Sequence, residues 1–258
     1  MSLRRNIPLT ARSVLASVLL GSEPPRLPTR MLVRTTALFG ISEGSTRTAL
    51  SRMVSAGEAV ADAGGYRLAG RLVSRQQRQI ASRQAEVRLW DGTWELATID
   101  ADTRRTAADR VALRQALAAL RLAETREGVW IRPDNLDPER SPDSAPVVER
   151  WCTRWRATRP DPAPDAERLW ALRGWSRQAT DLRRTMARLL VPLGEGDTTA
   201  LAGGFVTSAA VLRALQADPL LPPELLPSGW PGSGLRADYD TYDAAYRAVL
   251  RAWLQADA

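Results

Sequence analysis

The sequence predicts a mixed fold, with helices at both ends of the chain and a small α+β region between them. Apolar residues recur at helical spacing over residues 11–54 and again over residues 165–255. Short runs rich in β-branched and aromatic residues flank a helical pattern between residues 90 and 157. At 258 residues the chain also exceeds the length that one hydrophobic core comfortably serves, so we expect more than one domain.

The net positive charge of the chain comes from its N-terminal third. Residues 1–90 contain 14 arginines against 5 acidic residues, a net charge of +9, whereas residues 91–258 carry a net charge of −2. The chain contains no lysine, which genomic base composition alone would explain, but base composition does not explain the asymmetry. An anionic partner at the N-terminal end is therefore predicted.

Three helices are expected in the N-terminal region. The first covers Ala11–Leu20, and the second begins at Pro28, where the first turn of a helix tolerates proline, and ends at Gly40. The third follows Ser42, a good N-cap residue, and ends at Gly57. Two amphipathic helices joined by a short turn that contains glycine form a helix-turn-helix pattern.

A hairpin is expected directly after the third helix. Ala59–Ala61 and Tyr66–Leu68 are short extended segments, and Asp62–Gly65 between them is rich in turn residues. A helix-turn-helix followed by such a hairpin is a winged helix-turn-helix, which places its second helix of the motif in the major groove of duplex DNA.

The third helix would present one polar face to DNA. The 3.6-residue period turns Thr46, Ala49, Leu50 and Met53 toward the core. The side chains left facing outward form the predicted DNA-facing set: Ser45, Arg47, Thr48, Ser51 and Arg52. Arg47 is the strongest candidate for reading a base, because arginine can donate two hydrogen bonds to guanine. The alternative is an ordinary solvated helix face.

Four further arginines are predicted to contact phosphate, which adds affinity without sequence information. These are Arg26, Arg30, Arg34 and the wing residue Arg67. For each of them an ordinary surface position is an equal alternative.

The middle region begins after a linking helix over residues 71–89, which has a helical apolar pattern and is a candidate dimer seam. We expect strands at Thr93–Ile99 and Gly128–Arg132 and a helix at Arg104–Leu122. A third strand is expected at Val147–Ala157, after a loop over residues 133–146 rich in aspartate, proline and serine. In the helix, the residues expected to face inward are Val111, Leu113, Leu117 and Leu120.

The C-terminal region is predicted to be helical. Three helices are expected, at Asp165–Leu190, Leu201–Ala217 and Arg236–Gln255, with a proline-rich cluster between the last two. The resulting division is a DNA-binding domain at 1–70, a linking helix at 71–89, an α+β domain at 90–165 that is a candidate for dimerisation, and a helical domain at 166–258.

Five segments resemble the PaaX-type repressors, which regulate the degradation of phenylacetic acid and related aromatic compounds. The N-terminal matches are LFGISEGSTRTALSRMVSAGEAV and GGYRLAGR, and WDGTWELATID, GVWIRPDNL and DPLLPPELLPSGWPG follow in the family's order. The resemblance covers nearly the whole chain. The chain departs from the family pattern in a shortened wing at Ala69–Arg71 and in acidic, proline-rich insertions around residues 134–146.

This resemblance implies a winged helix-turn-helix, a ferredoxin-like α+β middle domain similar to small CRISPR-associated endonucleases, and a helical C-terminal domain. It also implies a homodimeric repressor that binds a near-palindromic operator in double-stranded DNA and is released by an aryl acyl-CoA such as phenylacetyl-CoA.

A ligand site in the middle region is a weaker prediction. Trp130 and Trp151 could stack on an aryl or adenine ring, and Arg132 and Arg154 could pair with the phosphates of coenzyme A. Core packing is the favoured interpretation of the tryptophans, because five of the nine lie in or beside this one small region.

Two other functions remain open. One is a metal-dependent nuclease that uses Asp100, which follows a strand in the domain that resembles a nuclease, although a single carboxylate is a poor magnesium site. The other is a DNA-binding regulator that responds to no small ligand.

The composition excludes many enzymes and predicts no metal or cofactor. The chain has no histidine and only one cysteine, Cys152, which excludes the usual zinc sites, Ser-His and Cys-His nucleophiles and an intrachain disulfide. Its longest apolar runs fall short of a membrane span, and no secretory pattern is present, so we expect a cytoplasmic protein without a membrane partner.

Overall fold

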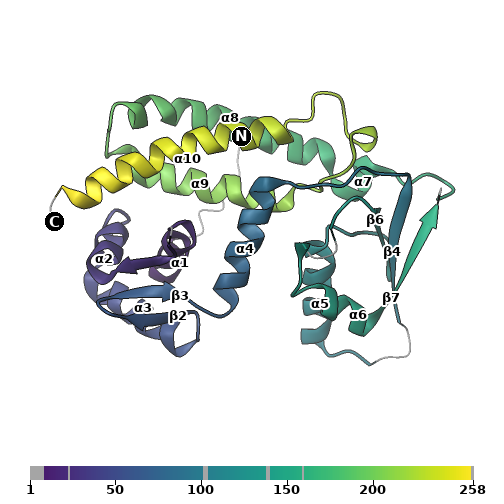
Figure 1. Ribbon diagram of the computed structural model, residues 1–258, viewed down its shortest axis with the longest axis horizontal. Coiled ribbons are helices and arrows are strands. Elements are labelled where there is room, and N and C mark those ends of the chain that lie inside the picture. The colour runs from purple at the N-terminus through teal and green to yellow at the C-terminus, as the bar shows by residue number, and fades with distance from the viewer. Residues whose placement is uncertain (1–8, 23, 101–103, 138–139, 159, 257–258) are drawn as a thin grey trace. The chain divides into compact units, whose positions relative to one another are not determined.

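The computed structural model describes residues 9–22, 24–100, 104–137, 140–158 and 160–256, and the chain path is drawn in Figure 1. The chain divides into two compact units. Unit 1 comprises Met1–Gln77, Arg184–Ala210 and Asp238–Ala258, and unit 2 comprises Arg78–Arg183 and Val211–Ala237. The C-terminal helices therefore contribute residues to both units, and the four-part division expected above stays a prediction.

Unit 1 contains the expected helix-turn-helix and hairpin. Its elements are α1 (Ala11–Gly21), β1 (Arg26–Pro28), α2 (Thr29–Ala37), α3 (Glu43–Ser55), β2 (Ala59–Asp62), β3 (Gly65–Leu68) and the first part of the linking helix α4 (Arg71–Gln84), whose residues from Arg78 onward belong to unit 2. Thr10 and Ser13 close a reciprocal capping box at the start of α1, and Gly40 takes a positive φ of 68° in the turn before α3. The mixed fold class, with helices at both ends of the chain and a small sheet in the middle, is confirmed.

The wing is a three-stranded sheet rather than the expected two-stranded hairpin. Strand β1 pairs antiparallel with β3, which gives the order β1-β3-β2. Prolines at both ends of this segment hid the strand from sequence reasoning, because proline is depleted in strands and allowed mainly at edges. A Cβ on Gly65 would lie 2.4 Å from the Leu27 carbonyl oxygen, so only glycine permits this close pairing.

Each helix from α1 to α4 contributes buried side chains to the core of the winged helix. Its buried residues are Leu15, Ala16, Leu19, Leu20, Leu32, Leu50, Met53, Ala59, Leu68 and Leu72. Leu72 belongs to α4, so the linking helix begins by closing this core. The apolar stripe of α3 is therefore fixed inward, and its polar face is left outward.

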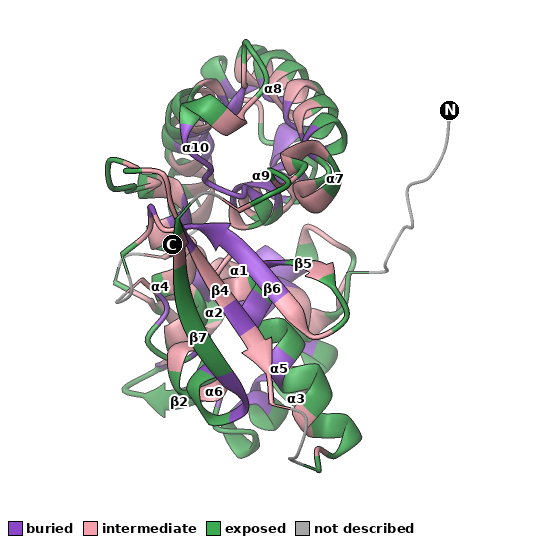
Figure 2. Cartoon of the chain, turned by 90° about the vertical axis from the view of Figure 1, so that its right-hand side faces the viewer, coloured by how far each residue is buried: buried purple, intermediate pink, exposed green. Residues whose placement is uncertain are grey.

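Unit 2 contains a βαββαβ domain with the ferredoxin-like order. Its elements are β4 (Thr93–Ile99), α5 (Ala107–Ala119), β5 (Ala123–Arg126), β6 (Val129–Pro133), α6 (Ala145–Trp151) and β7 (Cys152–Thr158). The strands form an antiparallel sheet in the order β5-β6-β4-β7. Figure 2 shows this sheet in front of α5 and α6, with β7 largely exposed and β6 largely buried.

Three expectations for this domain were wrong in detail. The strand predicted at Val147–Ala157 is helical up to Trp151, because Val148 and Trp151, three residues apart, pack together into the core. Val111 is 57% exposed, since it lies on the side of α5 opposite the buried Leu113 and Leu117. Strand β5 was not predicted.

The C-terminal helices are α7 (Ala166–Trp170), α8 (Leu172–Gly194), α9 (Ala200–Ala217) and α10 (Gly232–Gln255), with a short 3-10 turn at Pro223–Leu225. The single helix expected from Asp165 is broken at Ala171, which takes a left-handed conformation with φ of 49°. Helices α9 and α10 meet where Tyr242 donates a hydrogen bond to the Gly204 carbonyl oxygen. In the described part of the chain, α9 alone is long and apolar enough for a membrane span, and 44% of it is buried.

Candidate functional site

The outward face of α3 is polar and exposed to solvent. Ser42 caps the helix by accepting a hydrogen bond from the Ser45 backbone amide. The five residues predicted to face DNA are all exposed: Ser45, Arg47, Thr48, Ser51 and Arg52. Arg47 donates from Nε to Glu43 Oε1 at 2.7 Å, and both side chains are more than half exposed. An exposed pair of this kind is weak, so Arg47 can exchange it for an anionic or base partner.

A buried hydroxyl pair fixes the angle between the two helices of the helix-turn-helix. The Oγ1 atoms of Thr36 on α2 and Thr46 on α3 lie 2.7 Å apart, and both side chains are fully buried. Each hydroxyl also lies within hydrogen-bonding distance of a carbonyl oxygen of the preceding turn, so one threonine donates to the other and the second donates to the backbone. Thr46 thus points inward as predicted, and its hydrogen bond orients the outward face of α3.

The four arginines predicted to contact phosphate differ in the contacts that their side chains make within the protein. Arg30 and Arg67 are exposed, and their side chains make no hydrogen bond with the described residues. Arg26 is held at the tip of the wing, where it donates to Asp62 at 3.0 Å and to the Ala63 carbonyl oxygen. The side chains of Arg30 and Arg67 are therefore accessible to a ligand from solvent.

Arg34 instead makes contacts with residues of α10. Its guanidinium lies 4.4 Å from the ring centroid of Trp253 on α10, and its Nη1 donates to the Leu254 carbonyl oxygen. Phe39 at the end of α2 packs against Phe205 of α9 with ring centroids 5.0 Å apart. The C-terminal helices thus brace α2, and we remove Arg34 from the candidate DNA-contacting set.

A buried carboxylate anchors the winged helix, and sequence reasoning missed it. The Glu58 side chain is 1% exposed and accepts hydrogen bonds from Arg12 of α1 and Arg71 of α4. These arginine bonds hold the pKa of the Glu58 carboxyl below its ordinary value. No local pattern in the sequence marks Glu58, because Asp62 follows four positions later and no arginine lies between Arg52 and Arg67.

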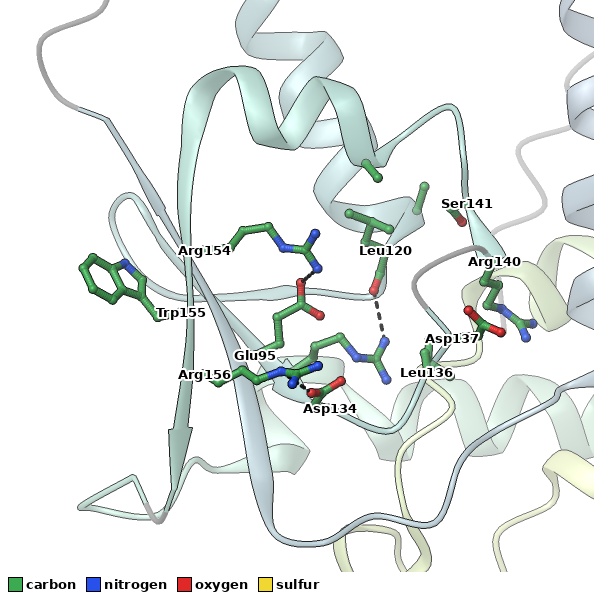
Figure 3. A pocket seen from close by; sticks show the side chains of 13 residues that line it. Glu95, Leu120, Asp134, Leu136, Asp137, Arg140, Ser141, Arg154, Trp155 and Arg156 are labelled. Atoms are coloured by element: carbon green, nitrogen blue, oxygen red, sulfur yellow. Dashed lines mark hydrogen bonds and ion pairs between the residues drawn. The ribbon is translucent and has the colours of Figure 1, made fainter.

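Unit 2 contains a cavity of about 360 Å³ beside the sheet. Its lining includes Glu95 and Arg154 as an ion pair and Arg156 paired with Asp134 at 2.9 Å. Figure 3 shows Arg154 and Arg156 on β7 pointing toward these acids, with Arg140 across the space and Trp155 pointing away. We call this cavity the arginine pocket; its full lining is Glu95, Ala119, Leu120, Arg132, Asp134, Leu136, Asp137, Arg140, Ser141, Ala145, Arg154, Trp155 and Arg156.

The four residues predicted to bind a ligand are separated by the structure. Arg132 and Arg154 both line the arginine pocket, although they lie on different strands. Trp130 and Trp151 belong to the hydrophobic core between the sheet and its helices and line no part of the pocket. We therefore remove the two tryptophans from the candidate ligand site.

Asp100 lies at the end of β4 and makes local contacts. Its carboxylate accepts a hydrogen bond from Thr153 Oγ1 at 2.9 Å, and its backbone amide donates to the Trp151 carbonyl oxygen. Within the described residues, which omit 101–103, no group of three or more acidic or cysteine side chains is placed to hold a metal ion. Nothing in this geometry favours the nuclease alternative.

The comparisons with known proteins match both domains described above. Residues 10–72 match the family description PaaX-like protein, and residues 87–144 match the PaaX protein central Cas2-like domain. The solved structure of the uncharacterized protein Rv0674 from Mycobacterium tuberculosis is 42% identical over 94% of this chain and 98% of that chain, with a TM-score of 0.69. The chain belongs to the PaaX family. No curated protein matches it.

Membership in the PaaX family, a family of transcriptional regulators, supports a regulatory role for the chain. The first match ends within α4, and the second begins shortly before β4, so the two matches bracket the linking helix. The polar face of α3 lies in the first matched region and part of the arginine pocket in the second.

Proposed function

We propose that this PaaX family member is a cytoplasmic, sequence-specific transcriptional repressor that binds double-stranded DNA through α3 and the wing. The observation that carries the proposal is the exposed polar face of α3, where Arg47 stands among small hydroxyl side chains. Such a face is suited to a recognition helix, because a single helix fits the major groove and arginine can read guanine there.

The surroundings of α3 support the same proposal. Arg30 and Arg67 are exposed cations with no ion-pair partner among the described residues, in the part of the chain that carries the net charge of +9. Contacts from such residues to phosphate would position the protein and provide affinity that depends on salt concentration.

We further propose a homodimer on a near-palindromic operator. The face of the sheet away from α5 and α6 carries Trp155, which is 57% exposed, beside its cross-strand neighbour Leu96. An exposed tryptophan next to a partly exposed leucine is suited to an interface with a second copy. Sedimentation equilibrium tests this: a monomer at micromolar concentration would contradict it.

The proposed signal for release is a small effector such as an aryl acyl-CoA, as in the repressors that the chain resembles. A coupling free energy of about 1–3 kcal/mol between effector and operator would lower DNA affinity roughly 5- to 150-fold. Titration of acyl-CoAs against an operator complex measures this coupling, and absence of release across a broad panel would favour a regulator without a ligand.

The DNA interface is tested by comparing two arginine variants. Arg47→Ala is expected to reduce the preference for operator over random DNA, with a loss of about 1–3 kcal/mol at one base position. Arg30→Ala is expected to weaken both complexes equally, because a phosphate contact carries no sequence information. Genome-wide occupancy first supplies the operator, and fluorescence anisotropy then measures both affinities.

The control is Arg114→Ala, which removes an exposed arginine from α5 in unit 2 and should change neither affinity. If Arg47→Ala leaves the ratio of operator to random affinity unchanged, α3 is not the reading helix.

A further inference from the structure

Glu43 and Arg47 form an ion pair on the outward face of α3. Glu43 is the first residue of the helix and Arg47 follows one turn later, so the two side chains are neighbours on the helix surface. The Arg47 Nε atom donates to Glu43 Oε1 at 2.7 Å, and the Arg47 and Glu43 side chains are 61% and 58% exposed. Arg52, the other arginine of α3, makes no ion pair with the described residues. Arg47 therefore differs from Arg52 in having a carboxylate that holds it.

The ion pair engages only the Nε atom of the Arg47 guanidinium. Three other ion-paired arginines of the winged helix, Arg12, Arg26 and Arg71, donate through Nη2 as well as through Nε. The described residues leave Nη1 and Nη2 of Arg47 without a hydrogen bond. Two such terminal nitrogens can donate together to O6 and N7 of a guanine. The ion pair thus leaves the end of Arg47 that can read guanine available.

The pair lies in the part of α3 whose backbone is held most closely by its neighbours. Ser42 caps the first turn, and Thr46, directly before Arg47 in the chain, is fully buried against Thr36. The positive end of the helix dipole also favours the Glu43 carboxylate, because it lies in the first turn. In a helix-turn-helix the N-terminal residues of the recognition helix contact base edges. Glu43 and Arg47 therefore lie where such contacts are made.

Holding Arg47 in advance lowers the cost of binding a base. A long side chain that is free in solution loses rotamer freedom when it binds, and the affinity decreases accordingly. The bond to Glu43 restricts Arg47 before DNA arrives, although in water an exposed pair is weak. Once DNA excludes water from this face, the same bond between charged groups becomes stronger. The pair therefore contributes more to the complex than to the stability of the free protein.

The Glu43 carboxylate also affects which part of DNA Arg47 contacts. The pair has no net charge, and Glu43 repels a phosphate that approaches Arg47. A phosphate therefore binds Arg47 well only if the bond to Glu43 is exchanged. Guanine offers O6 and N7 as neutral acceptors, which Arg47 can meet while it keeps that bond. Glu43 thus favours guanine over phosphate as the partner of Arg47.

We propose that Glu43 is a positioning residue for base recognition: its carboxylate holds Arg47 through Nε, so that Nη1 and Nη2 meet a guanine of the operator. This role rests on the proposed function of α3. It requires a guanine at the operator position that Arg47 contacts. It also requires that Glu43 weakens binding to random DNA, because the carboxylate keeps Arg47 from phosphates.

The test measures the affinity of the full-length protein for three duplexes by fluorescence anisotropy at several salt concentrations. Arg47→Ala first identifies the guanine, as the operator base whose replacement no longer changes affinity in that variant. The duplexes are the operator, the operator with adenine in place of this guanine, and a random sequence of the same length. The ratio of the first two affinities is the guanine preference.

Two substitutions of Glu43 separate its hydrogen bond from its charge. Glu43→Ala is expected to lower the guanine preference roughly 2- to 10-fold, the factor that corresponds to ordering one long side chain on binding. It should bind the random duplex more tightly, and the slope of log affinity against log salt should steepen by up to about 1, because Arg47 becomes available to a phosphate. Glu43→Gln keeps an acceptor oxygen without the charge, so it should gain the same affinity for random DNA but lose less of the guanine preference.

Asp62→Ala is the matched control, because it also removes an exposed acid that pairs with an arginine of the winged helix, here Arg26 on the wing. It is expected to change the affinities for all three duplexes by the same factor and to leave the guanine preference unchanged.

The positioning role of Glu43 is overturned if Glu43→Ala keeps the native guanine preference and salt slope and changes only the melting temperature, because Glu43 would then serve the helix alone. A base other than guanine at the position that depends on Arg47 would overturn it as well. In both cases Arg47→Ala still loses specificity, so recognition by α3 stands. If instead Arg47→Ala keeps the native ratio of operator to random affinity, the proposed function of α3 fails, and the two failures are thereby distinguished.

Discussion

The winged helix and the middle domain use the same residue type in opposite ways. On the winged helix, the side chains of Arg30, Arg52 and Arg67 are exposed and make no hydrogen bond with the described residues. In the middle domain, Arg132 is 1% exposed and satisfies neutral carbonyl oxygens. An exposed arginine costs the fold nothing and can meet an extended polyanion, whereas a buried one stabilises the fold only when its charge is compensated.

Exposed and buried arginines suit different kinds of anion. A flat, wet, positively charged surface suits a long chain of phosphates, and its strength falls as salt concentration rises. An enclosed pocket with a few aligned guanidinium groups suits one small anion, and salt screens it much less. Substitutions of arginine in the two regions should therefore differ in what they damage.

The largest effect is expected from Arg132→Ala. This change removes the Arg132 donor from the Leu120 carbonyl oxygen and the Asn135 side-chain oxygen, whereas the Pro133 carbonyl oxygen still accepts from the Asn135 backbone amide. The loss of unfolding free energy should reach about 3 kcal/mol or more, because unsatisfied buried groups cost about 1–3 kcal/mol each. Urea denaturation followed by tryptophan fluorescence measures it, and a loss below about 1 kcal/mol would show that the guanidinium is not structural.

An intermediate effect is expected from Glu58→Gln, which removes the buried carboxylate between Arg12 and Arg71. The loss should be about 1–2 kcal/mol at pH 7, because bonds between charged groups are weakened while the glutamine still accepts one hydrogen bond. The pKa of Glu58 is lowered in the folded state, so its contribution is complete above the ordinary value of 4.5 and disappears as the pH falls through the folded-state pKa.

The stability difference between the native protein and Glu58→Gln should therefore shrink as the pH falls from 7 to below about 4. Urea denaturation across this range tests the expectation. A difference that stays constant with pH would mean that Glu58 is not charged in the folded state.

The smallest effects distinguish Arg34 from Arg30, which lie on the same helix. Arg34→Ala should cost about 1 kcal/mol of stability, because it removes the contact with Trp253, and should leave the salt dependence of DNA binding unchanged. Arg30→Ala should leave stability within about 0.5 kcal/mol and reduce the slope of log affinity against log salt by about 1. The reverse pattern would return Arg34 to the DNA interface and remove Arg30 from it.

The local pattern of the sequence was sufficient for most elements of unit 1. Helical spacing, the N-cap residue Ser42 and the turn at Asp62–Gly65 are short-range signals, and each element that they predict is present. The pattern failed where a distant partner decides the outcome. Strand β1 exists because β3 is available to pair with it, and the segment around Val148 is helical because its apolar residues meet the core at helical spacing.

The candidate sites were predicted to different degrees, because one depends on neighbours in the sequence and the other on distant segments of the chain. The face of α3 follows from its 3.6-residue period, so exposure of Ser45, Arg47 and Arg52 could be read from the sequence. The arginine pocket could be read only in part: Arg132 and Arg154 were identified, but Arg140 comes from another segment of the chain.

The sequence by itself therefore determined the asymmetry of charge, the helix-turn-helix and the residues on its outward face, because all three depend on composition or on neighbours within a few positions. The tertiary structure alone decided which arginines are surface cations and which are buried. Arg34 and Leu254 are 220 positions apart in the chain, yet they share a hydrogen bond. Burial depends on such distant contacts, and no local pattern of residues contains them.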